Sequence, residues 1–168
     1  MQSISTQGMP VSQRLRFWEE SVSSLYAKTT VRRKDDCDFH GQIIWRMIGQ
    51  VIVSDIASSR QTVSREKRHI QPYDPGLVQI NLQLKGTCSI EQDGRIALTG
   101  PGEMAVYDSS RPYEMTFDGP FQQLSIDFPQ AILHDRFGRV QDFTARSISG
   151  VEGAGRFLYC FTRTLMEG

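Results

Sequence analysis

Tight chain reversals separated by short alternating segments constrain the fold of this sequence more than any other feature. Between residues 89 and 128 four turn signals fall eight to ten residues apart, at Asp93-Gly94, Pro101-Gly102, Ser109-Ser110 and Asp118-Gly119-Pro120. Asp-Gly favours a two-residue type I′ turn and Pro-Gly favours a type II turn, because glycine readily adopts the positive φ that both turns require. Between these signals apolar and polar residues alternate, which predicts half-buried strands.

The same alternation occurs upstream of these turns, in "HGQIIWRMIG", "QVIVSDIAS", "RQTVSREKRHI" and "GLVQINLQLKG". Roughly eight or nine short strands at this spacing predict an antiparallel sandwich or barrel. Closure into a barrel would also hide strand edges that otherwise pair with other chains. The fold class that we expect is therefore mainly β.

Helical periodicity occurs at both ends of the chain. After Pro10, apolar residues recur every three or four positions at Leu15, Trp18, Val22 and Leu25, which predicts one amphipathic helix. After Gly150 a second such stripe comprises Phe157, Leu158, Phe161 and Leu165. This stripe packs either on its own barrel or on the same helix of a second chain.

Composition limits the class of protein. With 168 residues the chain has the length of one domain with a real core, and its formal net charge of zero argues against a nucleic-acid-binding surface. The first ten residues do not resemble a secretory signal, and no apolar stretch is long enough to span a bilayer. Three widely separated cysteines favour reduced thiols, so we expect a cytoplasmic protein without membrane contact.

The sequence lacks the common signatures of catalysis. A metal site in a small barrel needs histidines on alternate strand positions, but His40, His69 and His134 are far apart, so we expect no metal and no cofactor. No serine elbow or phosphate-binding loop is present, so we name no catalytic residue. We read the histidines as loop or surface residues, and the charged run 65–68 as a solvated face.

A polar stripe on one strand suggests a binding pocket. Gln79, Asn81 and Gln83 alternate with apolar residues, and the stripe points either to water or into the barrel. A ligand cavity needs mostly apolar walls and a few polar groups. The other residues that we expect to line it are Trp45, Tyr113, Met115, Gln122 and Leu124.

Three segments together resemble the N-terminal sensing domain of AraC-type transcriptional regulators, in the AraC-binding-like subgroup. They are "RLRFWEESVSSLY", "QLKGTCSIEQDGR" and "GPGEMAVYDSSRPYEM", and the resemblance covers about residues 12 to 134. It implies a cupin-like barrel that binds a small effector, with the polar stripe, Tyr113 and Met115 facing inward. Asp108, Arg111 and Pro112 match the family's motif too, and we interpret them as turn-stabilising rather than ligand-contacting.

The resemblance also implies a domain organisation. We expect an effector-binding barrel over residues 1–150 and the start of a helical dimerisation segment over 151–168. No helix-turn-helix pattern occurs before Gly168, so we expect DNA contact only through a C-terminal domain that these residues do not include. The expected partners are a small effector and a second copy of the chain. The alternatives are a metal-free cupin enzyme, such as an isomerase, and a purely structural dimeric barrel. We disfavour the enzyme because the expected pocket contains no carboxylate.

Overall fold

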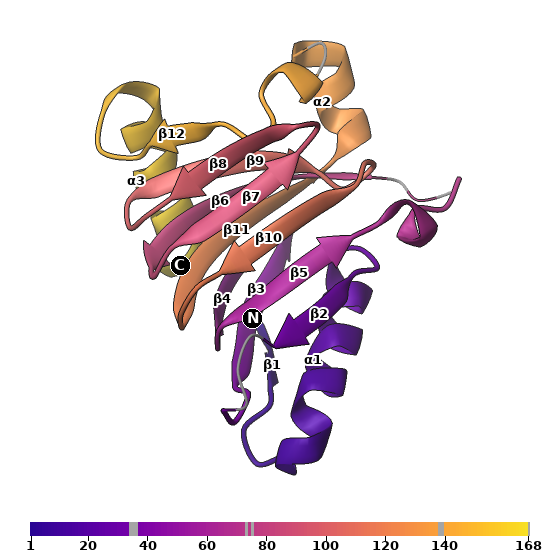
Figure 1. Ribbon diagram of the computed structural model, residues 1–168. Helices are drawn as coiled ribbons and strands as arrows, with labels where there is room; N and C mark the ends of the chain where they lie inside the picture. Colours follow the sequence, from indigo (N-terminus) through magenta and orange to yellow (C-terminus); the bar gives the residue numbers. More distant parts are fainter. Residues whose placement is uncertain (34–36, 73, 75, 138–139, 168) are drawn as a thin grey trace.

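The computed structural model describes residues 1–33, 37–72, 74, 76–137 and 140–167. These residues form two antiparallel sheets that pack face to face, with helices on the outside (Figure 1). In spatial order, the larger sheet contains β1 (Gln2–Ser5), β3 (Gly41–Ile48), β4 (Val51–Ser58), β11 (Phe121–Pro129), β6 (Leu77–Lys85), β9 (Glu103–Asp108) and β12 (Ser147–Ser149). The smaller sheet contains β2 (Thr30–Arg33), β5 (Gln61–Arg65), β10 (Tyr113–Phe117), β7 (Cys88–Gln92) and β8 (Arg95–Thr99).

The helices lie on different sides of the two sheets. The segments are α1 (Val11–Leu25), α2 (Gln130–Phe137), α3 (Gly153–Glu167) and the short 3₁₀ turns η1 (Lys67–His69) and η2 (Val140–Asp142). Helix α1 runs beside β2, whereas α3 packs on β4 and β11 of the larger sheet (Figure 1). Within the described residues, no helix is long and apolar enough to cross a membrane.

Local turn chemistry behaves as the sequence predicts. Asp93 and Gly94 both have positive φ, 52° and 72°, and they join β7 to β8 in a tight hairpin. Gly102 has φ of 85°, as the third position of a type II turn requires. The mainly β fold of two antiparallel sheets, with an N-terminal and a C-terminal helix, is therefore confirmed.

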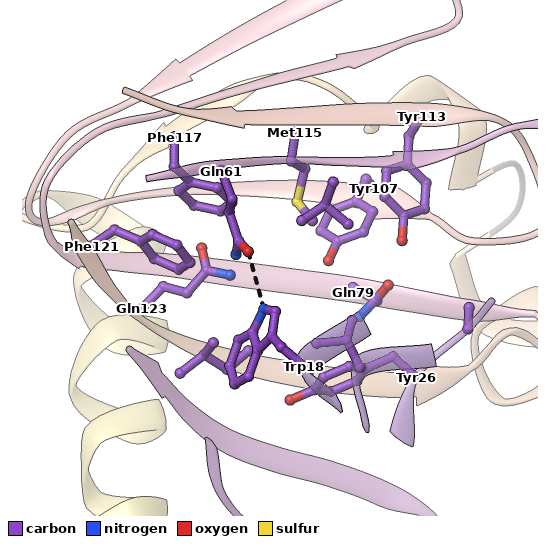
Figure 2. Close-up of a pocket in the computed structure, with 14 residues that line it drawn as sticks. Trp18, Tyr26, Gln61, Gln79, Tyr107, Tyr113, Met115, Phe117, Phe121 and Gln123 are labelled. Carbon is purple, nitrogen blue, oxygen red and sulfur yellow. Dashed lines mark hydrogen bonds between the residues drawn. The ribbon is translucent and has the colours of Figure 1, made fainter. Parts of the chain in front are cut away.

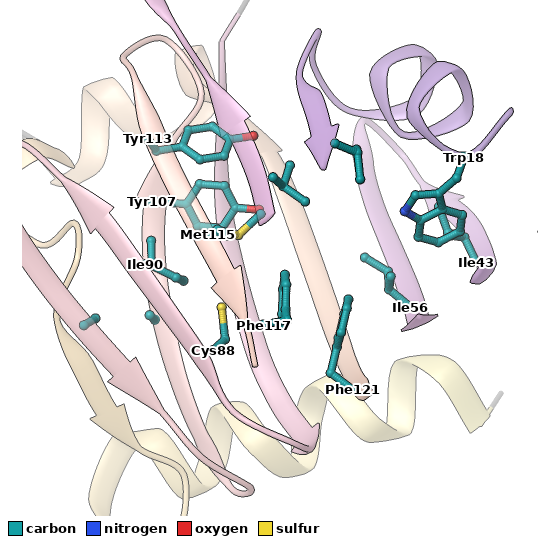
Figure 3. Packing of buried hydrophobic residues seen from close by; sticks show 14 of the residues in the cluster. Trp18, Ile43, Ile56, Cys88, Ile90, Tyr107, Tyr113, Met115, Phe117 and Phe121 are labelled. Carbon is teal, nitrogen blue, oxygen red and sulfur yellow. The ribbon is translucent and has the colours of Figure 1, made fainter. Parts of the chain in front are cut away.

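The main core lies between the two sheets and continues under α1 (Figure 3). Its buried side chains come from both sheets and from the helix, and they include Trp18, Ile43, Val63, Ile90, Met115, Phe117 and Phe121. A smaller cluster lies on the opposite face of the larger sheet, where Leu82, Met104 and Leu124 pack against residues of α3. The larger sheet is thus covered on both faces.

Two sequence interpretations outside the pocket are wrong. Arg65, which we assigned to a solvated face, is buried and donates to the carbonyls of Ser109 (2.6 Å) and Lys28 (2.7 Å) and to Asp74 (2.7 Å). His69, assigned to a loop or the surface, is also buried. The Arg65 side chain connects three segments that are distant in sequence, which a local reading of a charged run does not reveal.

Candidate functional site

An internal chamber lies between the two sheets and α1 (Figure 2). Its cavity volume is about 40 Å³, which is room for about three water molecules. Most of its wall is apolar or aromatic. The lining residues are Trp18, Val22, Tyr26, Ala27, Ile56, Gln61, Val63, Gln79, Tyr107, Tyr113, Met115, Phe117, Phe121 and Gln123. Mostly apolar walls with a few polar groups are typical of small-molecule sites.

Trp18 closes one side of the chamber and is held there in two ways. Its indole Nε1 donates to Gln61 Oε1 at 3.0 Å, as the dashed line in Figure 2 shows. Its ring also lies against Gly41, where an added Cβ would come within 2.4 Å of the ring. The absence of a side chain at position 41 therefore lets α1 approach the larger sheet closely.

Polar side chains from two neighbouring strands face the interior. On β11 these are Gln123, Ser125 and Asp127, and the residues opposite them on β6 are Gln83, Asn81 and Gln79. All six side chains are buried. We call these six residues the inner polar patch, and two of them, Gln79 and Gln123, line the chamber.

Asp127 is the charged member of the inner polar patch. Its Oδ1 accepts from Gln79 Nε2 at 2.5 Å and from Ser125 Oγ at 3.0 Å. Burial raises the pKa of Asp127 to about 7, although these two hydrogen bonds act in the opposite direction. A carboxyl group that titrates near neutral pH therefore lies directly behind Gln79, which lines the chamber.

Three tyrosines surround the same region. Burial raises the pKa of Tyr26, Tyr107 and Tyr113, and the Asp127 charge acts in the same direction on each. Tyr26 shares a 2.7 Å hydrogen bond with Ser54, and the Tyr107 hydroxyl accepts from Asn81 at 3.2 Å. A tyrosine side chain is either neutral or anionic, so none of these phenols can balance the carboxylate charge.

Five of the eight predicted pocket residues lie in the chamber wall or beside it. Gln79, Tyr113 and Met115 line the chamber, and Asn81 and Gln83 are buried beside it in the inner polar patch. The polar stripe therefore lies inside the sandwich and not in water.

Three other predicted residues do not line the chamber. Gln122 and Leu124 lie on the opposite face of β11, where Gln122 donates to Asp55 and Leu124 packs in the cluster beneath α3. Their assignment to the pocket is wrong, because successive strand residues point to opposite faces and Gln123 occupies the inner one. Trp45 is half-buried at the edge of the main core and is also absent from the chamber wall.

Sequence reasoning missed several residues of this site. The expectation that the interior contains no carboxylate is wrong, since Asp127 is fully buried there. The segment "QQLSIDF" carries the same alternation as "QINLQL", so its pattern already contained the signal for Gln123 and Asp127. Trp18, Tyr26, Gln61 and Tyr107 come together only through tertiary packing.

The C-terminal stripe divides between two sides of α3. Leu158, together with Tyr159, packs on the cluster beneath the helix, and Leu165 is half-buried. Phe157 and Phe161 are exposed by 76% and 48%, and their nearly parallel rings have centroids 6.4 Å apart. The four residues thus do not share one buried face, and the two phenylalanines form an exposed aromatic pair.

In the turn after β9, Asp108 and Arg111 interact as our interpretation of these residues predicts. Asp108 Oδ1 accepts from the Ser110 backbone N–H at 2.8 Å, and Oδ2 accepts from Arg111 Nε at 3.3 Å. This arrangement confirms the turn-stabilising role of Asp108 and Arg111. Across the described part of the chain, no three His, Cys, Asp or Glu side chains converge in a way that could hold a metal ion.

Comparison with known proteins identifies the family of this chain. A model of the AraC-binding-like domain matches residues 18–168. The chain belongs to this family. It is 30% identical to the transcriptional activator NphR of a Rhodococcus species over 160 residues, covering 91% of this chain and 47% of that protein. It is 31% identical over 134 residues to an uncharacterized protein in the nit 5′ region of Bacillus sp. strain OxB-1, covering 79% of this chain and 52% of that protein.

A solved structure shares the fold. The crystal structure of the AraC-like transcriptional activator CuxR aligns with a TM-score of 0.84 over 99% of this chain and 60% of that one, at 19% identity. Judged by its two curated relatives, NphR and the Bacillus protein, the chain spans about half the length of the proteins that it matches.

Proposed function

We propose that this domain binds a small-molecule effector in the internal chamber and that binding alters the packing of α3. The regulatory character of the family and of NphR supports this assignment. The observation that carries it is a chamber with mostly apolar walls, in which polar side-chain atoms have no hydrogen-bond partner among the described residues. A purely structural barrel would gain stability from a filled and satisfied interior.

Strands β6 and β11 connect the chamber to α3. Their inner residues include Gln79 and Gln123, which line the chamber. Their outer residues include Leu82 and Leu124, which pack in the cluster that Leu158 of α3 joins. Because interiors are close-packed, a shift of either strand when the chamber fills is transmitted to the helix on the other face.

The regulatory output requires parts beyond this domain. We assign DNA binding to a further part of the protein, because the chain spans only about half of its curated relatives. Self-association through the exposed pair Phe157 and Phe161 belongs to the same proposal. A dimer would place two copies of α3, each coupled to its own chamber, against one another in a two-fold contact.

Asp127 gives the enzyme alternative one specific argument. A carboxyl with a pKa of about 7 suits general acid–base catalysis near neutral pH. However, Asp127 lies behind Gln79 and does not line the chamber, and its neighbouring tyrosines are held neutral. The structure therefore favours sensing, and an isomerase would be revealed by turnover of a bound ligand.

A chamber-filling variant tests the proposed function. Val63 lines the chamber from β5, and Val63→Phe adds several carbon atoms in that limited space. In a thermal-shift screen of aromatic acids, amines and sugars, we expect ligands that stabilise wild type to lose their effect on Val63→Phe. Hydrogen exchange in α3 should also change when such a ligand binds to wild type.

The matched control is Ile96→Phe, which enlarges an exposed side chain on β8 far from the chamber wall. It should respond to ligands as wild type does. If Val63→Phe folds and still responds fully, the chamber is not the effector site. If no compound class stabilises wild type, the structural-barrel alternative gains support.

A further inference from the structure

The inner polar patch contains buried oxygen atoms that have no hydrogen-bond partner within the described part of the chain. Four of them occur on β6 and β11, namely Gln79 Oε1, Asn81 Oδ1, Gln123 Oε1 and Asp127 Oδ2. Amide and carboxylate oxygens only accept hydrogen bonds. What this region of the interior lacks is therefore a hydrogen-bond donor.

The orientation of the Gln79 amide follows from its neighbour. An ionised Asp127 accepts only, so Gln79 must turn its NH₂ group toward Oδ1 of that carboxylate, at 2.5 Å. The Gln79 oxygen then points away from Asp127. Because Gln79 lines the chamber, an acceptor backed by a negative charge lies at the chamber wall.

No positive charge of the described residues pairs with this carboxylate. Asp127 receives hydrogen bonds from two neutral side chains, those of Gln79 and Ser125. The titratable groups that face it are Tyr26 after α1, Tyr107 on β9 and Tyr113 on β10. Arg65 acts on Tyr113 but is engaged with Asp74 and two backbone carbonyls.

The chamber wall complements a cation in a second way. Aromatic rings of Trp18, Tyr107, Phe117 and Phe121 line it. The faces of such rings attract organic cations, and their area binds hydrocarbon. The limited space, about 40 Å³, favours a ligand of few atoms.

We propose, building on the effector function above, that the chamber binds a small organic ammonium ion. Its N–H groups donate to the oxygens of Gln79 and Gln123, and Asp127 supplies the counter-charge behind them. Its hydrocarbon part lies against the aromatic wall. Water molecules occupy the same positions when the ligand is absent.

Small compounds that share a hydrocarbon group but differ in charge separate the effect of charge on affinity from the effect of shape. Isobutylamine, isobutanol and isovalerate share one isobutyl group, and propylamine, propanol and butyrate share one propyl group. Binding is measured by calorimetry and by Trp fluorescence, since Trp18 lines the chamber. We expect at least one amine to bind roughly tenfold or more tightly than its alcohol and its acid, as for a charge-assisted hydrogen bond.

Two carboxylate variants provide the residue test. Asp127→Asn keeps the shape and removes the counter-charge, so amine affinity should fall by roughly tenfold or more while alcohol affinity is unchanged. The control Asp55→Asn removes a carboxylate from the outer face of the same sheet, where Asp55 accepts from Gln122. It should bind amines as wild type does.

A measurement on wild type keeps the test decisive if Asp127→Asn does not fold. Alkylamines stay protonated from about pH 8 to about pH 5, as lysine does. Over this range protonation neutralises Asp127, whose pKa is about 7, so amine affinity should fall roughly tenfold or more while alcohol affinity stays constant. Constant amine affinity would overturn the proposal.

The remaining outcomes distinguish the two proposals. If an alcohol or acid binds as tightly as its amine and Val63→Phe abolishes that binding, the ammonium proposal is wrong. The proposal that the chamber binds an effector is then retained. If neither amine binds at millimolar concentration, the ammonium proposal is overturned. If amines bind equally well to Val63→Phe, the chamber is not their site, and both proposals fail.

Discussion

At the scale of single residues, protonation of the buried Asp127 makes the stability of the folded protein depend on pH. Its pKa is about 7 in the folded protein, compared with an ordinary value of 3.8. The folded state therefore binds this proton more tightly than the unfolded state does. The contribution of this protonation to the unfolding free energy is fully present below about pH 4 and is lost as the pH rises to about 7. Above that pH we expect little further change.

We expect Asp127→Asn to remove this pH dependence. A difference of about three pKa units corresponds to roughly 4 kcal/mol of unfolding free energy as an upper bound. The variant should therefore be more stable than wild type at pH 8, and similar to it near pH 4. Denaturant melts at several pH values measure this directly. Asp55→Asn should retain the wild-type slope, and an unchanged slope in Asp127→Asn would assign the titration to another group.

At the scale of elements, α1 depends on its close approach to β3. Trp18 is buried, and its ring occupies the space that a side chain at position 41 would need. The helix contributes Trp18 and Val22 to the chamber wall. Displacement of α1 would therefore open the chamber as well as the core.

We expect Gly41→Ala to destabilise the protein by roughly 1–3 kcal/mol, because the new Cβ would lie within 2.4 Å of the Trp18 ring. The Trp fluorescence spectrum should shift toward that of an exposed indole. Gly119→Ala is the matched control, since nothing lies within 4 Å of an added Cβ there. A wild-type melting curve for Gly41→Ala would show that α1 adjusts without cost.

A second element, α3, exposes an aromatic pair. If these rings form a contact between two copies, Phe161→Glu should give a folded monomer with little loss of melting temperature, since Phe161 is already 48% exposed. Analytical ultracentrifugation of wild type and variant provides the measurement. Arg156→Glu changes the charge on another side of the same helix and should leave association intact. Monomeric wild type at high concentration would refute the dimer.

At the scale of the whole molecule, one sheet serves two purposes. The inner face of β6 and β11 forms the inner polar patch, and their outer face supports α3. Such an arrangement suits a sensor, because a ligand on one face and a partner on the other share the same two strands. Under the proposed function, the output depends on what α3 contacts outside this domain.

We expect these 168 residues by themselves not to bind duplex DNA in a sequence-selective way. The formal net charge is zero, and specific protein–DNA contact relies strongly on basic side chains. Fluorescence anisotropy with labelled promoter fragments at several salt concentrations measures this. A salt-sensitive and sequence-selective signal at sub-micromolar protein would contradict it.

Local sequence chemistry determined much of the architecture. Asp93-Gly94 forms the expected hairpin because both residues accept positive φ. The stripe containing Trp18 and Val22 forms α1, and the alternation around Gln79 forms β6. In each case neighbouring residues contain the physical cause, so the sequence alone was sufficient.

Only tertiary structure decided which surfaces meet. Alternation shows that a strand has two faces, but the packing partners decide which face is inside, so Gln122 and Leu124 lie outside while Gln123 and Asp127 lie inside. The division of the C-terminal stripe likewise follows from the sheet beneath α3. The charge state of Asp127 depends on desolvation by the whole interior, because the energy of a buried charge depends on every group that replaces water around it.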